Sequence, residues 1–147
     1  MKRILAVLLG LALVLSLAAC SQGNHTQKNI PYSKLNQREK TALNFTENLY
    51  SGNKSKQYAA IDRFTAKQTI SSLKEKISAG KFQQTFHAVE VLKGVNVKSG
   101  KGNEFLVLLE MKDQKNVTNK RIVVMAGDKV LHILSGNSKT YAKELGS

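Results

Sequence analysis

The chain contains one cysteine, Cys20, which directly follows the longest apolar run of the sequence. That run extends from Ile4 to Ala19 behind a basic start, with one glycine and one serine inside it. A basic start, an apolar centre and small residues before a cleavage point are typical of an export signal. As a transmembrane helix, the sixteen residues would reach about 24 Å, less than the ~30 Å hydrocarbon core of a bilayer. The sequence therefore predicts a signal peptide over residues 1–19.

The last four residues of this segment, Leu17-Ala18-Ala19-Cys20, resemble the lipobox of bacterial lipoproteins, a short motif with a fixed cysteine. The resemblance implies that the Cys20 thiol receives a diacylglycerol and that a signal peptidase cuts just before it. Cys20 would then be the first residue of the mature chain, and the motif leaves open whether that residue is diacylated or also carries a further fatty acid such as palmitate. A cysteine used in this way forms no disulfide, so the folded part depends on packing alone.

Two acyl chains anchor a protein stably, whereas one chain, at ~0.8 kcal/mol per buried methylene, holds it only marginally. We therefore expect an extracytoplasmic protein that is lipid-anchored to the cell membrane of a bacterium. In a Gram-negative cell, the expected location is the outer membrane. Residues 20–32 are predicted to form the lipidated cysteine and a polar tether, and the eleven residues from Ser21 to Pro31 span at most about 36 Å.

Removal of residues 1–19 leaves 128 of the 147 residues, enough for one domain with a substantial core. The formal charge falls from +13 to +11, because Lys2 and Arg3 leave with the signal. A basic surface is attracted to anionic lipid headgroups and to anionic wall polymers, and the alternative is a solubilising surface without a partner. Nucleic acid is not expected as a partner, because the basic residues are dispersed and the aromatic residues fall at core periods.

The first half of the folded part has helical periodicity. Leu35, Ala42, Phe45 and Leu49 fall on one face of a helix that is expected to begin after Ser33 as N-cap and to end near Gly52. A second helix is predicted over Lys56 to Phe64, and a third, capped by Thr65, ends near Gly80 with Ile70, Leu73 and Ile77 on one stripe. All three helices are amphipathic and need a surface to cover.

The second half has the pattern of strands and turns. Extended segments are predicted over Phe82 to Val97, Glu104 to Lys112, Val117 to Met125 and Lys129 to Leu134, with a bulge or break at Gly94. The remaining residues, 137–147, are predicted to be a C-terminal tail, either a short helix or a frayed end, and a terminal position favours fraying.

Helices followed by an antiparallel meander predict an α+β domain over residues 33–136, with two or three N-terminal helices packed on a curved four-stranded sheet. This element order is similar to that of NTF2-like domains, which are cystatin-like, cone-shaped α+β folds. The resemblance rests on element order without a diagnostic motif. It implies a pocket in the cone and, as in many such domains, pairing of two copies through the sheet.

The strands are apolar on both faces. Phe105, Val107 and Leu109 point to one side of the sheet, while Leu106 and Leu108 point to the other. Helices on one face would leave the second set in water. Either the sheet curls around a small core, or its far face meets a protein partner or a second copy of the chain.

Reactive groups are sparse. The histidines, His25, His87 and His132, show no metal-ligand spacing, so we expect neither a metal site nor a cofactor. Pocket enzymes of the NTF2-like type use an Asp or a His with a Tyr, and this resemblance makes Tyr58, Asp62 and His132 the candidate pocket residues. No motif assigns them catalytic positions, and we expect a protein that is not an enzyme.

The sequence thus predicts a membrane-anchored surface lipoprotein that acts as a non-enzymatic accessory or binding module without a specified partner. One alternative is an NTF2-like pocket protein that binds or converts a small ligand. Another is an immunity or exclusion lipoprotein of a mobile element.

Overall fold

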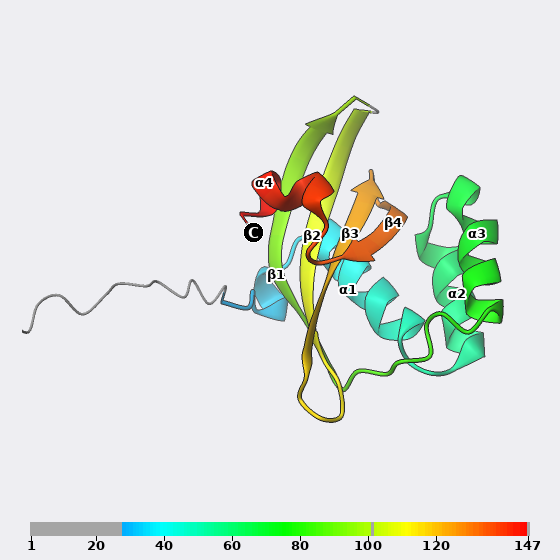
Figure 1. Cartoon of the computed structure of the whole chain (residues 1–147). Helices are drawn as coiled ribbons and strands as arrows, with labels where there is room; N and C mark the ends of the chain where they lie inside the picture. Colours follow the sequence, from blue (N-terminus) through cyan, green and yellow to red (C-terminus); the bar gives the residue numbers. More distant parts are fainter. Residues whose placement is uncertain (1–27, 101, 147) are drawn as a thin grey trace, which may run out of the picture.

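The computed structural model describes residues 28–100 and 102–146 (Figure 1). The predicted signal peptide and Cys20 lie outside these residues. Helices precede strands along the chain, which confirms the α+β class, and no helix in the described part is long and apolar enough to cross a membrane. The elements are η1 (Tyr32–Lys34), α1 (Gln37–Leu49), α2 (Lys54–Phe64), α3 (Lys67–Ser78), β1 (Ala88–Ser99), β2 (Gly102–Lys112), β3 (Thr118–Ala126), β4 (Lys129–Ser135), η2 (Lys139–Tyr141) and α4 (Ala142–Leu145).

The four strands form one antiparallel meander in the order β1-β2-β3-β4, as the sequence predicts. The turn between β2 and β3 is held by Asp113, whose Oδ1 accepts the backbone N–H groups of Lys115 at 2.8 Å and Val117 at 2.9 Å. Between β3 and β4 the chain reverses through Gly127, whose φ of 57° suits a residue without a side chain.

The first helix begins later than predicted. Ser33 lies in η1, and the N-cap of α1 is Asn36, whose Oδ1 accepts the Glu39 backbone N–H at 3.0 Å. Glu39 Oε2 in turn accepts the Asn36 backbone N–H at 2.7 Å. This reciprocal pair is a capping box, and a glutamate three residues after the cap is its sequence signature.

The caps of the other two helices also differ from the expectation. Asn53 caps α2, which begins two residues before the predicted Lys56, because the Asn53 side chain accepts the Lys56 backbone N–H at 3.1 Å. Thr65 does not cap α3, since its hydroxyl donates back to the Ile61 carbonyl oxygen of α2, and Ala66 holds the cap position.

The first strand begins at Ala88 and not at Phe82. The segment before it is a loop, because Gln57 Nε2 donates to the Phe82 carbonyl oxygen at 2.9 Å and to that of Leu49 at 2.7 Å, so this carbonyl is used outside the sheet. Phe82 itself is buried in the core.

The β1 bulge falls at Leu92 and not at the predicted Gly94, since the register shifts between Val91 and Lys93. Gly94 is needed for another reason. A Cβ there would clash with Glu39 Oε1 and lie 2.8 Å from the Phe105 ring, so α1 approaches the sheet closely at this position.

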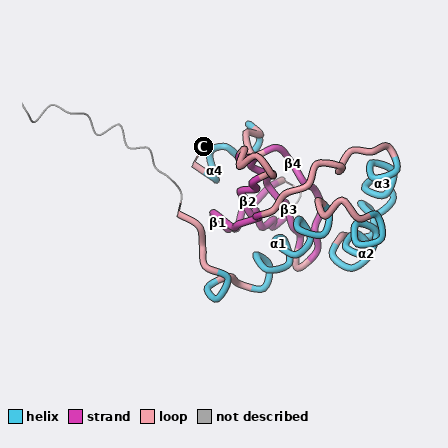
Figure 2. Tube along the Cα trace, turned by 90° about the horizontal axis from the view of Figure 1, so that it is seen from below, coloured by secondary structure: helices cyan, strands magenta, loops and turns pink. Residues whose placement is uncertain are grey.

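The sheet separates two apolar cores, and Figure 2 shows α1 and α4 on its opposite sides. The larger core lies between the sheet and the helices α1, α2 and α3, on what is called the near face of the sheet. The strand residues in this core include Phe105, Val107 and Leu109. The smaller core lies on the far face and includes Leu106, Leu108 and the C-terminal Leu145.

Leu145 is 1% exposed, so the C-terminal segment is packed and does not fray. It covers far-face residues of the two-sided strands, a solution that neither sequence-based alternative named. At the other end, the Ile30 backbone N–H donates to the Val91 carbonyl oxygen at 2.8 Å. The packed part of the chain therefore extends past both ends of the predicted range 33–136.

Candidate functional site

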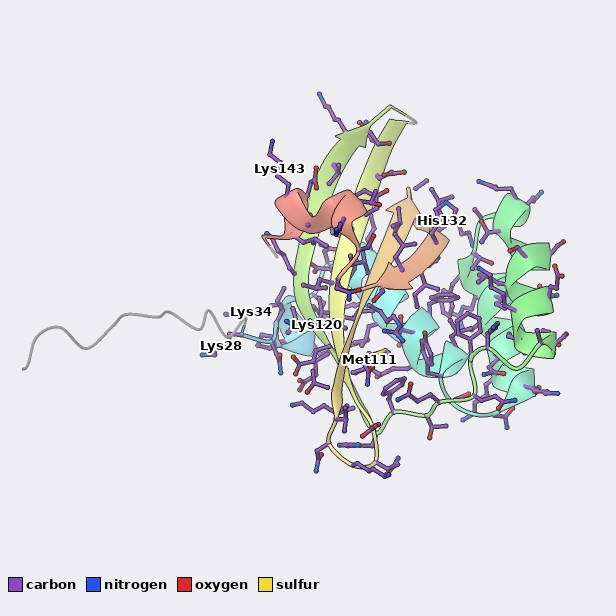
Figure 3. All side chains as sticks on the ribbon, viewed as in Figure 1. Lys28, Lys34, Met111, Lys120, His132 and Lys143 are labelled. Atoms are coloured by element: carbon purple, nitrogen blue, oxygen red, sulfur yellow. The ribbon has the colours of Figure 1, made fainter. Side chains whose placement is uncertain are left out.

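The surface of the described domain is basic, and side chains that end in nitrogen surround it (Figure 3). The whole chain has 23 lysines and arginines against 10 acidic residues. Within the described residues, ion pairs engage just two of these cations, Lys74 and Lys112. Several carboxylates are used internally, including Glu39 in the capping box and Glu104 beneath the C-terminal segment. Most of the positive charge therefore faces the solvent uncompensated.

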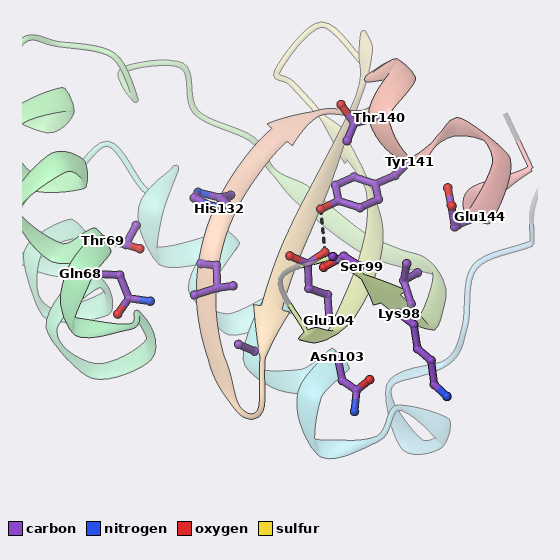
Figure 4. A pocket seen from close by; sticks show the side chains of 14 residues that line it. Gln68, Thr69, Lys98, Ser99, Asn103, Glu104, His132, Thr140, Tyr141 and Glu144 are labelled. Atoms are coloured by element: carbon purple, nitrogen blue, oxygen red, sulfur yellow. Dashed lines mark hydrogen bonds between the residues drawn. The ribbon is translucent and has the colours of Figure 1, made fainter.

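A hollow of about 740 Å³ opens beside the C-terminal segment (Figure 4). Its walls come from five parts of the chain: the start of α3, the end of the β1–β2 hairpin, the last residue of β3, the middle of β4 and the η2–α4 segment. The polar side chains in the wall include Gln68, Glu104, His132 and Tyr141. A hollow of this size fits a small polar molecule or one side chain of a partner protein.

The central contact of this site joins Tyr141 to Glu104. The Tyr141 hydroxyl donates to Glu104 Oε2 at 2.8 Å, and Glu104 is 8% exposed (Figure 4). Burial, the hydrogen bond to Glu104, and the charges of Glu104 and Glu144 raise the pKa of Tyr141 to about 12. The phenol therefore keeps its proton at physiological pH. It acts as a fixed hydrogen-bond donor and not as a base.

A second carboxylate lies close to this pair. Glu144 Oε2 is buried and accepts no hydrogen bond from the described residues, while the Glu144 backbone carbonyl accepts one from Lys93 Nζ at 3.1 Å. The hollow therefore combines two carboxylates with a phenol and with Lys98, while Lys93 holds the backbone of α4 instead of a carboxylate.

His132 lies on β4 opposite Val124, is exposed, and lines the hollow. The other two candidate residues lie elsewhere on the domain. The Tyr58 hydroxyl is 3.1 Å from Ser78 Oγ, and Asp62 forms an ion pair of 2.7 Å with Lys74, which links α2 to α3.

Tyr58 and Asp62 thus both lie on α2 and contact α3, and these two helices are called the outer helices below. His132 lines the hollow without them. His87 is exposed in the loop before β1, whereas His25 and the lipidation candidate Cys20 lie outside the described residues. Among the residues that the structure describes, no group of three or more His, Cys, Asp or Glu is placed to hold a metal ion.

Sequence reasoning missed Tyr141, because the C-terminal tail was expected to fray. A short signal was present: Tyr141 and Leu145 are four residues apart, and Gly146 follows them with a φ of 72°. An apolar i, i+4 pair followed by a glycine in the left-handed region is the pattern of a helical turn that ends at its C-cap. Comparison with protein-family models, with curated proteins and with solved structures gives no match to this chain.

Proposed function

We propose that this chain is a bacterial surface lipoprotein that is anchored through Cys20 and acts as a non-enzymatic accessory or binding module outside the cytoplasm. The observation that carries the proposal is the position of the lone cysteine, at the end of the apolar run and within Leu17-Ala18-Ala19-Cys20. A diacylglycerol on Cys20 supplies the two acyl chains that stable anchoring requires.

The start of the folded domain supports an arrangement close to the membrane. The Asn29 side chain donates to Glu90 Oε2, and Ile30 pairs with Val91 of β1, so the packed chain begins at residue 29. Nine residue steps separate Asn29 from Cys20 and span at most about 32 Å. The tether is therefore shorter than the eleven residues counted from the sequence, and the domain works next to the lipid surface.

The chemistry of the polar groups favours binding over catalysis. Tyr141 is a protonated donor to Glu104, Tyr58 contacts Ser78, and Asp62 is held by Lys74. A general base needs a free lone pair directed at a substrate, and each of these groups contacts a partner within the domain, so that among the buried side-chain atoms of the described residues Glu144 Oε2 is left without one. Fixed donors and acceptors in a hollow instead suit recognition of a polar group.

The anchor is tested by intact-mass and detergent-partition analysis of the protein isolated from a bacterial host. We expect a lipid-sized mass on a chain that begins at Cys20, and partition into detergent. Cys20→Ala should lose both, while the matched variant Ser21→Ala should keep both. An unlipidated native chain that stays in the aqueous phase would overturn the proposal.

A second candidate is a pocket protein of the NTF2-like kind, and the hollow of about 740 Å³ favours it. Fragment screening by NMR on the labelled chain tests this candidate. Fragments that shift signals of the hollow should bind more weakly to His132→Ala and Tyr141→Phe. Tyr58→Phe and Asp62→Asn, which lie outside the hollow, serve as controls and should leave fragment binding unchanged. Equal losses of fragment affinity in all four variants would exclude the hollow as the site.

A further inference from the structure

Both ends of the packed chain lie beside β1, an edge strand of the sheet. The N-terminal segment meets this edge at Val91, where the Ile30 backbone N–H donates to the Val91 carbonyl oxygen. The C-terminal segment contacts β1 through the side chain of Lys93, whose Nζ donates to the Glu144 carbonyl oxygen. Figures 1 and 2 agree that the start and the end of the described chain lie on the β1 side. A chain that connects residue 28 to a lipid on Cys20 would therefore keep the β1 side of the domain toward the membrane.

One aromatic side chain projects into solvent where the packed chain begins. Tyr32 of η1 is 58% exposed, and in the described residues just one other large hydrophobic side chain, Val117 in the β2–β3 turn, is exposed to a similar degree. Tyr32 borders a hollow of about 400 Å³ that Ile30, Leu35 and other apolar residues line. A ring with an apolar body and a polar tip is suited to the headgroup level of a bilayer.

Three lysines lie in this part of the chain. Lys28 and Lys34 lie where the described chain starts (Figure 3), and Lys40 Nζ is 5.3 Å from the centre of the Tyr32 ring. None of the three forms an ion pair with a described carboxylate. The acidic residues at the same hollow are Glu47 and Glu90, of which Glu90 is held by Asn29 and lies 4.0 Å from Lys112. The balance at this place is positive.

We propose that the η1 surface, defined as Lys28, Tyr32, Lys34 and Lys40, rests on anionic lipid headgroups, with the three lysines on the phosphates and Tyr32 at the headgroup level. This inference rests on the proposed function, since the anchor sets the distance and brings this side to the membrane. Wall polymers would be met first by the outward side of the domain, where α2 and α3 carry lysines of their own.

The central test uses residues 21–147 without lipid, a chain that retains every described element and both cores, which run from Leu35 to Leu145. Binding to vesicles of phosphatidylcholine mixed with phosphatidylglycerol is measured by co-sedimentation at low salt. We expect binding to the mixed vesicles, no binding to pure phosphatidylcholine, and loss of binding at high salt.

The variants remove three charges from either side of the domain. Replacing Lys28, Lys34 and Lys40 together by Gln should weaken binding by about a hundredfold, since each lysine near an anionic surface contributes about a factor of five. The matched control replaces the exposed Lys54, Lys56 and Lys76 of α2 and α3 by Gln, with the same loss of net charge. The control should lose much less affinity, and equal losses would overturn the proposal.

A second readout does not depend on charge changes. The chain has no tryptophan, so Tyr32→Trp and Val117→Trp each place a single reporter on the lipidated protein. On mixed vesicles, the fluorescence of Tyr32→Trp should shift to the blue and be quenched by brominated lipid, while that of Val117→Trp should not. A solvent-exposed signal from both reporters would refute contact of the η1 surface with lipid.

Soluble polyphosphate serves as the wall-like probe. If it bound the unlipidated chain more tightly than the mixed vesicles did, a free anionic polymer would be the partner and the lipid assignment would be wrong. The vesicle assay omits Cys20, so failure of lipidation and failure of headgroup binding are read from separate experiments.

Discussion

Leu145→Ala tests whether the C-terminal segment is a structural part of the domain. Leu145 is 1% exposed and packs in the far-face core with Leu106, Leu108 and Ile122. Truncation of a buried leucine costs about 2–5 kcal/mol through lost transfer free energy and the cavity that remains. Since a four-residue helix can undock as a unit, its docking free energy limits the loss, and we expect about 3 kcal/mol. In a domain whose total stability is about 5–15 kcal/mol, that is a large fraction.

The measurement is urea unfolding of residues 21–147, followed by circular dichroism, with thermal unfolding beside it. A loss of this size lowers the melting temperature by about 10 °C in a domain of this length. Lys143→Ala is the matched control, because it lies on the same helix but is exposed, and it should change the free energy of unfolding by less than about 0.5 kcal/mol. If Leu145→Ala behaved like the control, the C-terminal segment would be frayed and the far face would be covered in another way.

Two further substitutions test the site and the approach of α1 to the sheet. Because the pKa of Tyr141 is raised to about 12 in the folded state, its contribution to stability is full below the ordinary value near 10 and is lost as pH rises from there. The unfolding free energy of the native chain should fall relative to Tyr141→Phe in alkaline urea titrations, and parallel curves would contradict the assignment. Gly94→Ala, which adds a Cβ against Glu39 and Phe105, should cost about 1–3 kcal/mol in the same assay, while Gly100→Ala, with open space around it, should cost almost nothing.

Local patterns in the sequence were sufficient for the type and order of most elements. The continuous apolar run at residues 105–109 and the spacing of Leu73 and Ile77 both predict buried side chains, and all of these side chains are buried in the structure. The first residue of a helix was harder to predict from the sequence, because Ser33 and Asn36 are both good N-cap residues. The choice between them depends on the reciprocal contact of Asn36 with Glu39.

The candidate site was out of reach for a related reason. Its central hydrogen bond joins Tyr141 to Glu104, 37 residues earlier in the chain, and no local period encodes such a contact. The tail gave too short a signal, since one helical turn has no repeat. The sequence grouped His132 with Tyr58 and Asp62 as candidates for one pocket, but His132 lines the hollow without them, and the position of Tyr58 and Asp62 depends on how α2 meets α3.

Neither edge of the sheet is free along its whole length. At β1, the Ile30 backbone N–H already donates to the Val91 carbonyl oxygen, and at β4 the Ala66 backbone N–H donates to the Val130 carbonyl oxygen at 2.9 Å. Such contacts block the addition of a strand from a partner at these positions. Because helices cover one face and the C-terminal segment packs on the other, the proposed binding would use side chains or the remaining parts of these edges. The hollow with Tyr141 and His132 and the basic outer helices α2 and α3 offer such side chains away from the η1 surface.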